Sequence, residues 1–81
     1  MKKLIEQLTE ISNEVLIESG REPVGLLRRE MDLRKDLDFD SLDLAILTVK
    51  IEALFSVDVF EKGLVRTVGE IVSQLEERRD G

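Results

Sequence analysis

The 81-residue chain contains no cysteine, histidine, tryptophan or tyrosine. These absences exclude disulfide frameworks, zinc sites, thiol nucleophiles and serine–histidine triads for the chain acting alone. Any chemistry that it performs by itself must come from carboxylates, lysine, arginine or hydroxyl groups. A long apolar run is also missing, and the N-terminus, MKKLIEQLTE, lacks the apolar stretch of a signal peptide. We therefore expect a cytoplasmic protein that does not insert into a membrane.

The residues that are present are those of a small globular domain. Hydrophobic residues make up 42% of the chain and are mostly leucine, isoleucine and valine, which suffices for a core although 37% of the residues are charged. The length allows one domain, so residues 1–81 are expected to form a single unit.

The acidic charge is concentrated in one segment. Residues 36–61 hold seven acidic side chains and one lysine, which accounts for the whole net charge of −6. Such a segment predicts a basic protein partner that is steered to it electrostatically. An acidic surface without interleaved aromatic residues argues against nucleic acid as a partner.

Helical periodicity predicts the first two main helices. Residues 2–19 carry an apolar stripe with spacings of three and four residues, and Gly20 follows as a stop signal. Residues 42–55 are apolar on most sides and are too long for a typical strand. Such a helix is expected either to be largely buried or to present an apolar surface to a partner.

The rest of the chain completes an all-α small helical bundle of three main helices plus one short helix. Thr67 and Glu70 have the spacing of a capping box and predict the last helix over 68–79. A short helix is expected at 60–64. Residues 20–40 form a long connection whose apolar residues predict that it packs against the helices.

The stretch DLDFDSLDL, residues 36–44, suggests three different sites. A calcium loop starting at Asp36 would place oxygen ligands at alternate aspartates, but its sixth position needs glycine and is Ser41, and its twelfth needs glutamate and is Leu47. A phosphatase-like D-x-D site would need a larger fold to enclose its substrate. We therefore expect no metal site in this stretch.

Two interpretations of Ser41 remain open from its position. Serine is a good N-cap, and Asp43 in the first turn would favour the positive end of the helix dipole. In that case the chain is a small acidic helical protein-interaction module with Ser41 only a helix N-cap. A serine at a helix start is also exposed, and a phosphate ester formed there would meet an anion-friendly helix terminus.

A resemblance favours the second interpretation. The stretch Asp36-Leu37-Asp38-Phe39-Asp40-Ser41-Leu42 is similar to the D-L-G-x-D-S-L motif of the acyl carrier protein family. The resemblance extends to the first helix, the long connection, the acidic second helix and the "TV" that opens the last helix. It implies a bundle of the acyl-carrier-protein type in which Ser41 carries a covalent 4′-phosphopantetheine from coenzyme A. Acyl cargo would ride on the thiol of this arm as a thioester, and the chain would not itself be an enzyme.

The resemblance also implies partners. These are a phosphopantetheinyl transferase and acyl-transferring or synthase enzymes of lipid, fatty-acid or polyketide-type biosynthesis, which would dock on a monomer through basic patches. The positions that match the family's recognition surface are Asp40, Leu42, Asp43, Ala45, Ile46, Val49, Glu52 and Ala53. Core packing is an equally good interpretation of Leu42 and Val49, and an ordinary solvated face is as good for Glu52.

Three positions depart from the family pattern. Asp38 stands where the family commonly has glycine, and aspartate is among the less costly replacements if that residue needs a positive φ. Ile46 and Ala53 stand where many fatty-acid carriers have acidic residues. These departures favour a specialised carrier over the housekeeping fatty-acid type.

Overall fold

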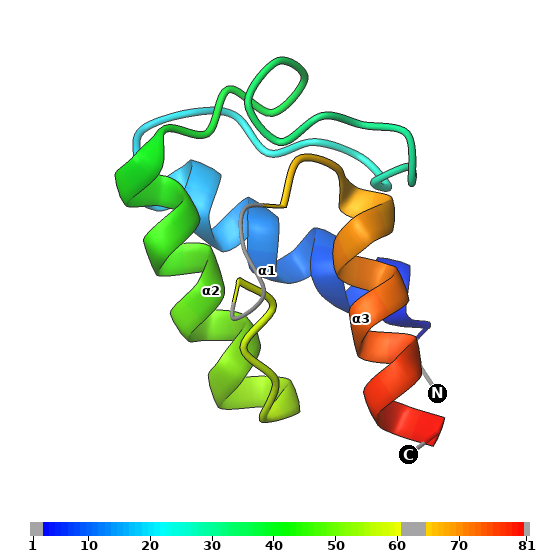
Figure 1. The fold of residues 1–81 in the computed structure, drawn as a ribbon. Helices are drawn as coiled ribbons and strands as arrows, with labels where there is room; N and C mark the ends of the chain where they lie inside the picture. Colours follow the sequence, from blue (N-terminus) through cyan, green and yellow to red (C-terminus); the bar gives the residue numbers. More distant parts are fainter. Residues whose placement is uncertain (1–2, 61–64, 81) are drawn as a thin grey trace.

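The structure of the protein is a computed structural model, which describes residues 3–60 and 65–80. Within these residues there is no strand, and the backbone forms three helices: α1 (Leu4–Glu18), α2 (Ser41–Phe55) and α3 (Val68–Asp80). In Figure 1, α2 and α3 begin beside the long connection and descend on the two sides of the view, and α1 crosses between them. Helix α1 packs against both of the others. The all-α class with three main helices is thus confirmed for the described part of the chain.

Helix α1 buries one stripe and ends in a glycine turn. Its buried residues recur at helical spacing, as the sequence predicts: Leu4, Leu8, Ile11, Ser12, Val15 and Leu16. Gly20 has φ = 78°, its N–H donates to the Ile17 carbonyl at 3.0 Å, and the Arg21 N–H donates to the Leu16 carbonyl at 2.8 Å. This pair of bonds is the Schellman pattern, which only a residue tolerant of positive φ allows. It places Arg21 directly at the end of α1.

Side chains of α1 hold the first half of the long connection. Asn13 forms two hydrogen bonds with the backbone of Val24: its Nδ2 donates to the carbonyl at 3.0 Å and its Oδ1 accepts from the N–H at 2.8 Å. The Thr9 hydroxyl accepts from the Leu27 N–H at 3.0 Å. The connection is therefore packed down, as expected from its apolar residues, and it buries Leu27, Leu33, Leu37 and Phe39.

The second half of the connection is joined to the start of α3. The Leu33 N–H donates to the Arg66 carbonyl at 2.8 Å, and Asp32 forms an isolated backbone bridge with Thr67. The capping box predicted for α3 is present, since the Thr67 N–H donates to Glu70 Oε2 at 2.9 Å and the Glu70 N–H donates to Thr67 Oγ1 at 3.3 Å. The short helix predicted at 60–64 falls on residues 61–64, which lie outside the described residues.

Helix α2 is apolar on two faces, of which one is buried. Leu44, Leu47 and Ile51 form the core face. On the opposite face Leu42 is 69% exposed and Val49 is 67% exposed. The sequence predicted that this helix would either be largely buried or present an apolar surface. The exposure of Leu42 and Val49 shows that α2 presents an apolar surface. Across residues 3–60 and 65–80, no helix reaches the length and apolar content that a membrane crossing requires.

Candidate functional site

The start of α2 is capped by Asp40. Asp40 is extended (φ −96°, ψ −175°) and its Oδ1 accepts from the Asp43 N–H at 2.9 Å, while Asp43 Oδ2 accepts from the Asp40 N–H at 3.1 Å. This is a complete capping box, and it makes Ser41 the first residue of the helix. The interpretation of Ser41 as the N-cap is therefore wrong. The reciprocal bond needs an acceptor three residues after the cap, and that residue is Asp43 counted from Asp40 but Leu44 counted from Ser41.

Because Asp40 caps the helix, the Ser41 hydroxyl is not used by the backbone. Ser41 is exposed, and its Oγ accepts from Arg34 Nη2 at 3.4 Å. This contact is the one interaction of the Ser41 side chain among the described residues. The serine thus presents an exposed hydroxyl, without a backbone partner among the described residues, at the first turn of a helix, where the backbone N–H groups favour negative charge.

A groove of about 380 Å³ opens beside this hydroxyl. It follows the first two turns of α2 towards Phe60, and its lining residues are Arg34, Ser41, Leu44, Ala45, Thr48, Asp58 and Phe60. The Thr48 hydroxyl donates to the Leu44 carbonyl at 2.8 Å, and Asp58 Oδ1 accepts from the Phe60 N–H at 3.0 Å. These polar groups already have partners within the chain, so the groove offers mainly apolar contact next to the serine.

Asp43 does not belong to the exposed surface, although the family resemblance places it among the docking residues. It is only 6% exposed, and its carboxylate accepts from the Ser19 hydroxyl at 2.9 Å, from Arg21 Nη2 and from the Asp40 N–H. All of these donors come from within the chain. A partner could reach the carboxylate only after Arg21 and Ser19 had moved away.

The same contacts set the charge of Asp43. Burial alone would raise the pKa of this carboxyl, but hydrogen bonds from Asp40, Ser19 and Arg21, together with the positive charge of Arg21, outweigh burial and hold the pKa below its ordinary value. Asp43 is therefore ionised at neutral pH and forms a partly buried ion pair with Arg21.

Arg21 connects the end of α1 to the loop that precedes the serine. Its guanidinium donates to the Asp38 carbonyl as well as to Asp43, and its Cζ lies 5.6 Å from the centre of the Phe39 ring. Asp38 has φ = 57°, so the positive φ anticipated at this position is present. Arg21 is a site residue that the sequence pattern does not reveal, because its partners are 17 and 22 residues away.

The remaining predicted docking residues share one side of α2. Leu42, Ala45, Val49, Glu52 and Ala53 are exposed, and Ile46 is half-buried against the core. The exposure of Leu42 and Val49 excludes core packing as the role of these two side chains. Asp40 is exposed at the end of the same face, so the face combines apolar side chains with acidic groups at Asp40 and Glu52.

The two neighbouring residues at the helix start are expected to respond differently to alanine. Asp40→Ala removes the cap and should lower the free energy of unfolding by about 1 kcal/mol. Ser41→Ala removes a hydroxyl that stabilises little and should change it by less than about 0.5 kcal/mol. Urea unfolding of both variants measures the difference. A larger loss for Ser41→Ala than for Asp40→Ala would show that Ser41 is the cap.

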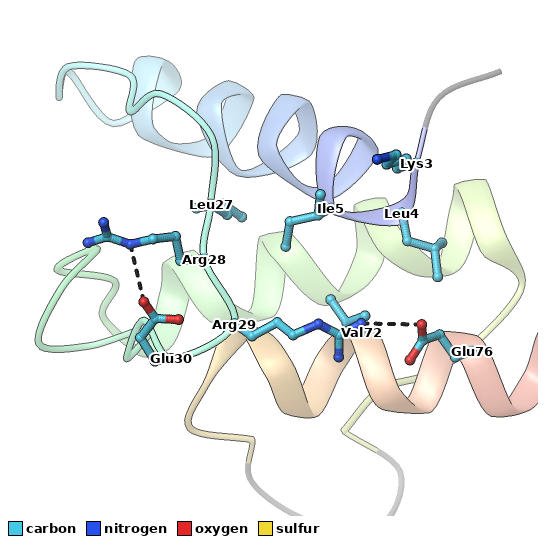
Figure 2. Close-up of a pocket in the computed structure, with 9 residues that line it drawn as sticks. All are labelled: Lys3, Leu4, Ile5, Leu27, Arg28, Arg29, Glu30, Val72 and Glu76. Atoms are coloured by element: carbon cyan, nitrogen blue, oxygen red, sulfur yellow. Dashed lines mark hydrogen bonds and ion pairs between the residues drawn. The ribbon is translucent and has the colours of Figure 1, made fainter.

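A second cavity, of about 560 Å³, lies between the start of α1, the connection and α3. Figure 2 shows two ion pairs among the lining residues: Arg29 extends along α3 to Glu76 at 3.2 Å, and Arg28 is directed to Glu30 at 3.3 Å. The described lining residues of this cavity include no serine or threonine, and both arginines have carboxylate partners. It shares no lining residue with the groove beside Ser41.

Acidic residues are numerous around Ser41, but among the described residues no three of them are placed to hold a metal ion together. Asp40 and Asp43 are engaged in the capping box, and Asp36 Oδ2 accepts from the Asp32 N–H at 2.6 Å. Three of the four aspartates of DLDFDSLDL thus accept hydrogen bonds from the local backbone, and the carboxylate of the fourth, Asp38, is exposed.

The site is therefore an exposed serine at the first turn of α2, with one arginine beside it, an apolar groove below it and an apolar, acid-edged helix face next to it. Comparison of the chain with protein-family models, with curated proteins and with solved structures finds no match.

Proposed function

We propose that the chain is a phosphopantetheine carrier of the acyl carrier protein type, with Ser41 as the attachment point. The observation that carries the proposal is the division of roles at the start of α2. Asp40 and Asp43 satisfy the capping bonds, which leaves the Ser41 hydroxyl exposed in the D-S-L context. An exposed serine that the helix does not need for capping is suited to modification by another protein.

The surroundings of Ser41 favour modification by a separate enzyme over self-activation. A nucleophilic serine needs a general base in hydrogen-bond contact, and the chain has no histidine. The only described contact of Ser41 Oγ is an arginine, which is a proton donor and cannot accept the hydroxyl proton. Asp40 and Asp43 are bound to each other's backbone N–H groups.

The attachment step balances with coenzyme A as the donor. Ser41 Oγ attacks the phosphorus atom that bears the pantetheine arm, an O–P bond forms, and the P–O bond of the pyrophosphate breaks. The electron pair leaves on adenosine 3′,5′-bisphosphate, and the serine proton passes to a base of the transferase. Once attached, the group supplies a thiol that this cysteine-free chain lacks, and acyl cargo is carried on it as a thioester.

The residues around Ser41 are compatible with this group. The hydroxyl is exposed, Arg34 supplies a positive charge next to it, and the groove offers Leu44, Ala45 and Phe60 as apolar contacts. The three described helices also agree with the wider proposal of an acyl-carrier-type bundle with a fourth short helix. We extend the proposal to a cytoplasmic monomer, specialised rather than dedicated to housekeeping fatty-acid synthesis.

The exposed face of α2 supports docking of the proposed partner enzymes. Leu42 and Val49 present apolar area, and Asp40 and Glu52 present acidic groups that match a basic patch. Each exposed ion pair contributes only about 0–1 kcal/mol, which suits a carrier that must leave one enzyme for the next. Asp43 is excluded from this surface because Arg21 already pairs with it.

The same face supports a second function, a helical interaction module that binds a basic protein without any modification at Ser41. This alternative needs only the apolar and acidic side chains of α2. It gives no role to the serine, which neither caps the helix nor lies in the core.

Intact-mass spectrometry after incubation with coenzyme A and a promiscuous phosphopantetheinyl transferase separates the two functions. We expect the wild-type chain to gain the mass of one phosphopantetheine group and Ser41→Ala to gain none. Ser73→Ala serves as a control that removes an exposed serine hydroxyl from α3, away from the docking face, and it should still be loaded. A folded wild-type sample that gains no mass would refute the carrier function and favour the interaction module.

A further inference from the structure

We propose that Arg34 binds the phosphodiester of the arm at Ser41 and thereby directs the arm along the groove beside α2. This inference rests on the proposed function, because it assumes that Ser41 is modified. It assigns to Arg34 a role in holding the attached group.

Arg34 differs from the other described arginines in the partner of its guanidinium. Within residues 3–60 and 65–77, the other arginines all form ion pairs with carboxylates: Arg21, Arg28, Arg29 and Arg66. The guanidinium of Arg34 has no carboxylate partner in this part of the chain, and its one contact is Ser41 Oγ at 3.4 Å. An arginine next to a hydroxyl that is to become a phosphate ester is already in place to bind the new anion.

The backbone that carries Arg34 is fixed from several sides. Asp32 Oδ1 accepts from the Arg34 N–H at 2.8 Å and from the Lys35 N–H at 2.9 Å. Leu33, the preceding residue, is buried and bonded to the Arg66 carbonyl at 2.8 Å. The backbone of Arg34 is therefore already ordered. Binding a phosphate costs only the conformational entropy of the arginine side chain.

The negative charge around the serine would be offset by such an arginine. Asp36, Asp38 and Asp40 are all exposed within five residues of Ser41, and each repels an added phosphodiester. Among the described residues, Arg34 is the one cation in hydrogen-bond contact with the Ser41 hydroxyl, and a bidentate guanidinium matches two phosphate oxygens.

The position of Arg34 also gives the arm a direction. Arg34 and Ser41 both line the groove, and the groove continues past Ala45 and Thr48 to Phe60. A phosphodiester paired with Arg34 at this end leaves the rest of the arm facing the apolar lining. Without the pair, repulsion by the aspartates would favour an arm that extends into solvent.

Phosphorus NMR of the loaded protein tests this proposal directly. Wild type, Arg34→Gln and Arg28→Gln are loaded with phosphopantetheine, and loading is first checked by intact mass. Arg28 is the matched control, an exposed arginine of the same connection that pairs with Glu30 and does not line the groove. The chemical shift of the phosphodiester is then followed from low to high salt, because salt screens an exposed pair.

We expect Arg34→Gln to lower the ratio of paired to free phosphodiester at low salt about two- to fivefold, the range given by an exposed ion pair. The phosphorus shift of this variant should depend little on salt. Arg28→Gln should behave like wild type, and Arg34→Lys should retain part of the salt dependence. The amide resonances of Ala45 and Thr48 should shift on loading in wild type and much less in Arg34→Gln.

The possible failures are distinguishable. If all variants are loaded and Arg34→Gln gives the same shift and salt dependence as Arg28→Gln, the role of Arg34 is refuted while the carrier function stands. If wild type is not loaded at all, the carrier function fails and this inference falls with it.

Discussion

Asp43→Asn is expected to lower the free energy of unfolding by about 2–3 kcal/mol, because a charged, buried hydrogen-bond acceptor is lost while its donors remain. The carboxylate accepts from Ser19, Arg21 and the Asp40 N–H and is 6% exposed. In the variant the guanidinium of Arg21 loses its closer carboxylate partner and keeps only Asp38 Oδ2 at 3.9 Å, and the amide can serve only part of the three donors. Urea unfolding at neutral pH measures the loss.

Glu52→Gln is the matched control for this prediction. It removes the same charge from the same helix, but Glu52 is exposed. The control should change the free energy of unfolding by less than about 0.5 kcal/mol. Equal, small effects of the two variants would show that the cluster around Asp43 contributes nothing to stability.

Asp43 should also shape the dependence of stability on pH. Its pKa is lowered, as are those of Asp32 and Glu70, which accept backbone hydrogen bonds mainly from Lys35 and Arg34 and from Thr67 and Arg66. A carboxyl whose pKa is lower in the folded than in the unfolded state stabilises the fold above its ordinary pKa. This stabilisation is lost as the pH falls below about 5 and through the folded-state values. The loss should be smaller in Asp43→Asn than in wild type or Glu52→Gln.

Leu47→Ala is expected to lower the free energy of unfolding by about 3 kcal/mol, since Leu47 is fully buried on the core face of α2 and its truncation leaves a cavity. Leu42 is the same residue type on the same helix, but it is 69% exposed. Leu42→Ala should therefore change stability by less than about 0.5 kcal/mol.

Loading by the transferase should depend on Leu42 more than on Leu47, the reverse of their expected effects on stability. On the proposed function, Leu42→Ala removes apolar contact with the transferase and should lower kcat/KM for loading roughly five- to tenfold. Leu47→Ala should leave loading of the folded fraction nearly unchanged. A large loss of stability in Leu42→Ala would contradict the orientation of α2 described here.

The three helices could be predicted from local patterns because each depends on residues close in sequence. The stripe of α1 and the capping box of Thr67 and Glu70 are set by spacings of three and four residues. The two faces of α2 are harder to assign, because both Leu44 and Leu42 belong to apolar stripes. Periodicity shows that two stripes exist, and only packing against the other elements decides that the stripe of Leu44 lies inside.

The candidate site was predicted less completely, for two physical reasons. Asp40 and Ser41 are both good N-caps, and the choice between them depends on which one has an acceptor three residues later. The partner of Asp43 is Arg21, 22 residues earlier, and no local pattern connects them. For Asp38 the sequence supported only a conditional expectation, that aspartate would be tolerated if the position needed a positive φ, and the observed φ of 57° meets that condition.

The central claim, that Ser41 is displayed for covalent attachment, is tested most directly by mapping the modification. The chain is incubated with coenzyme A and a phosphopantetheinyl transferase, digested and analysed by tandem mass spectrometry. We predict the phosphopantetheine mass on Ser41 alone, with Ser12, Ser19, Ser56 and Ser73 unmodified. A folded chain that carries no adduct, or one that carries it on another serine, would contradict the account.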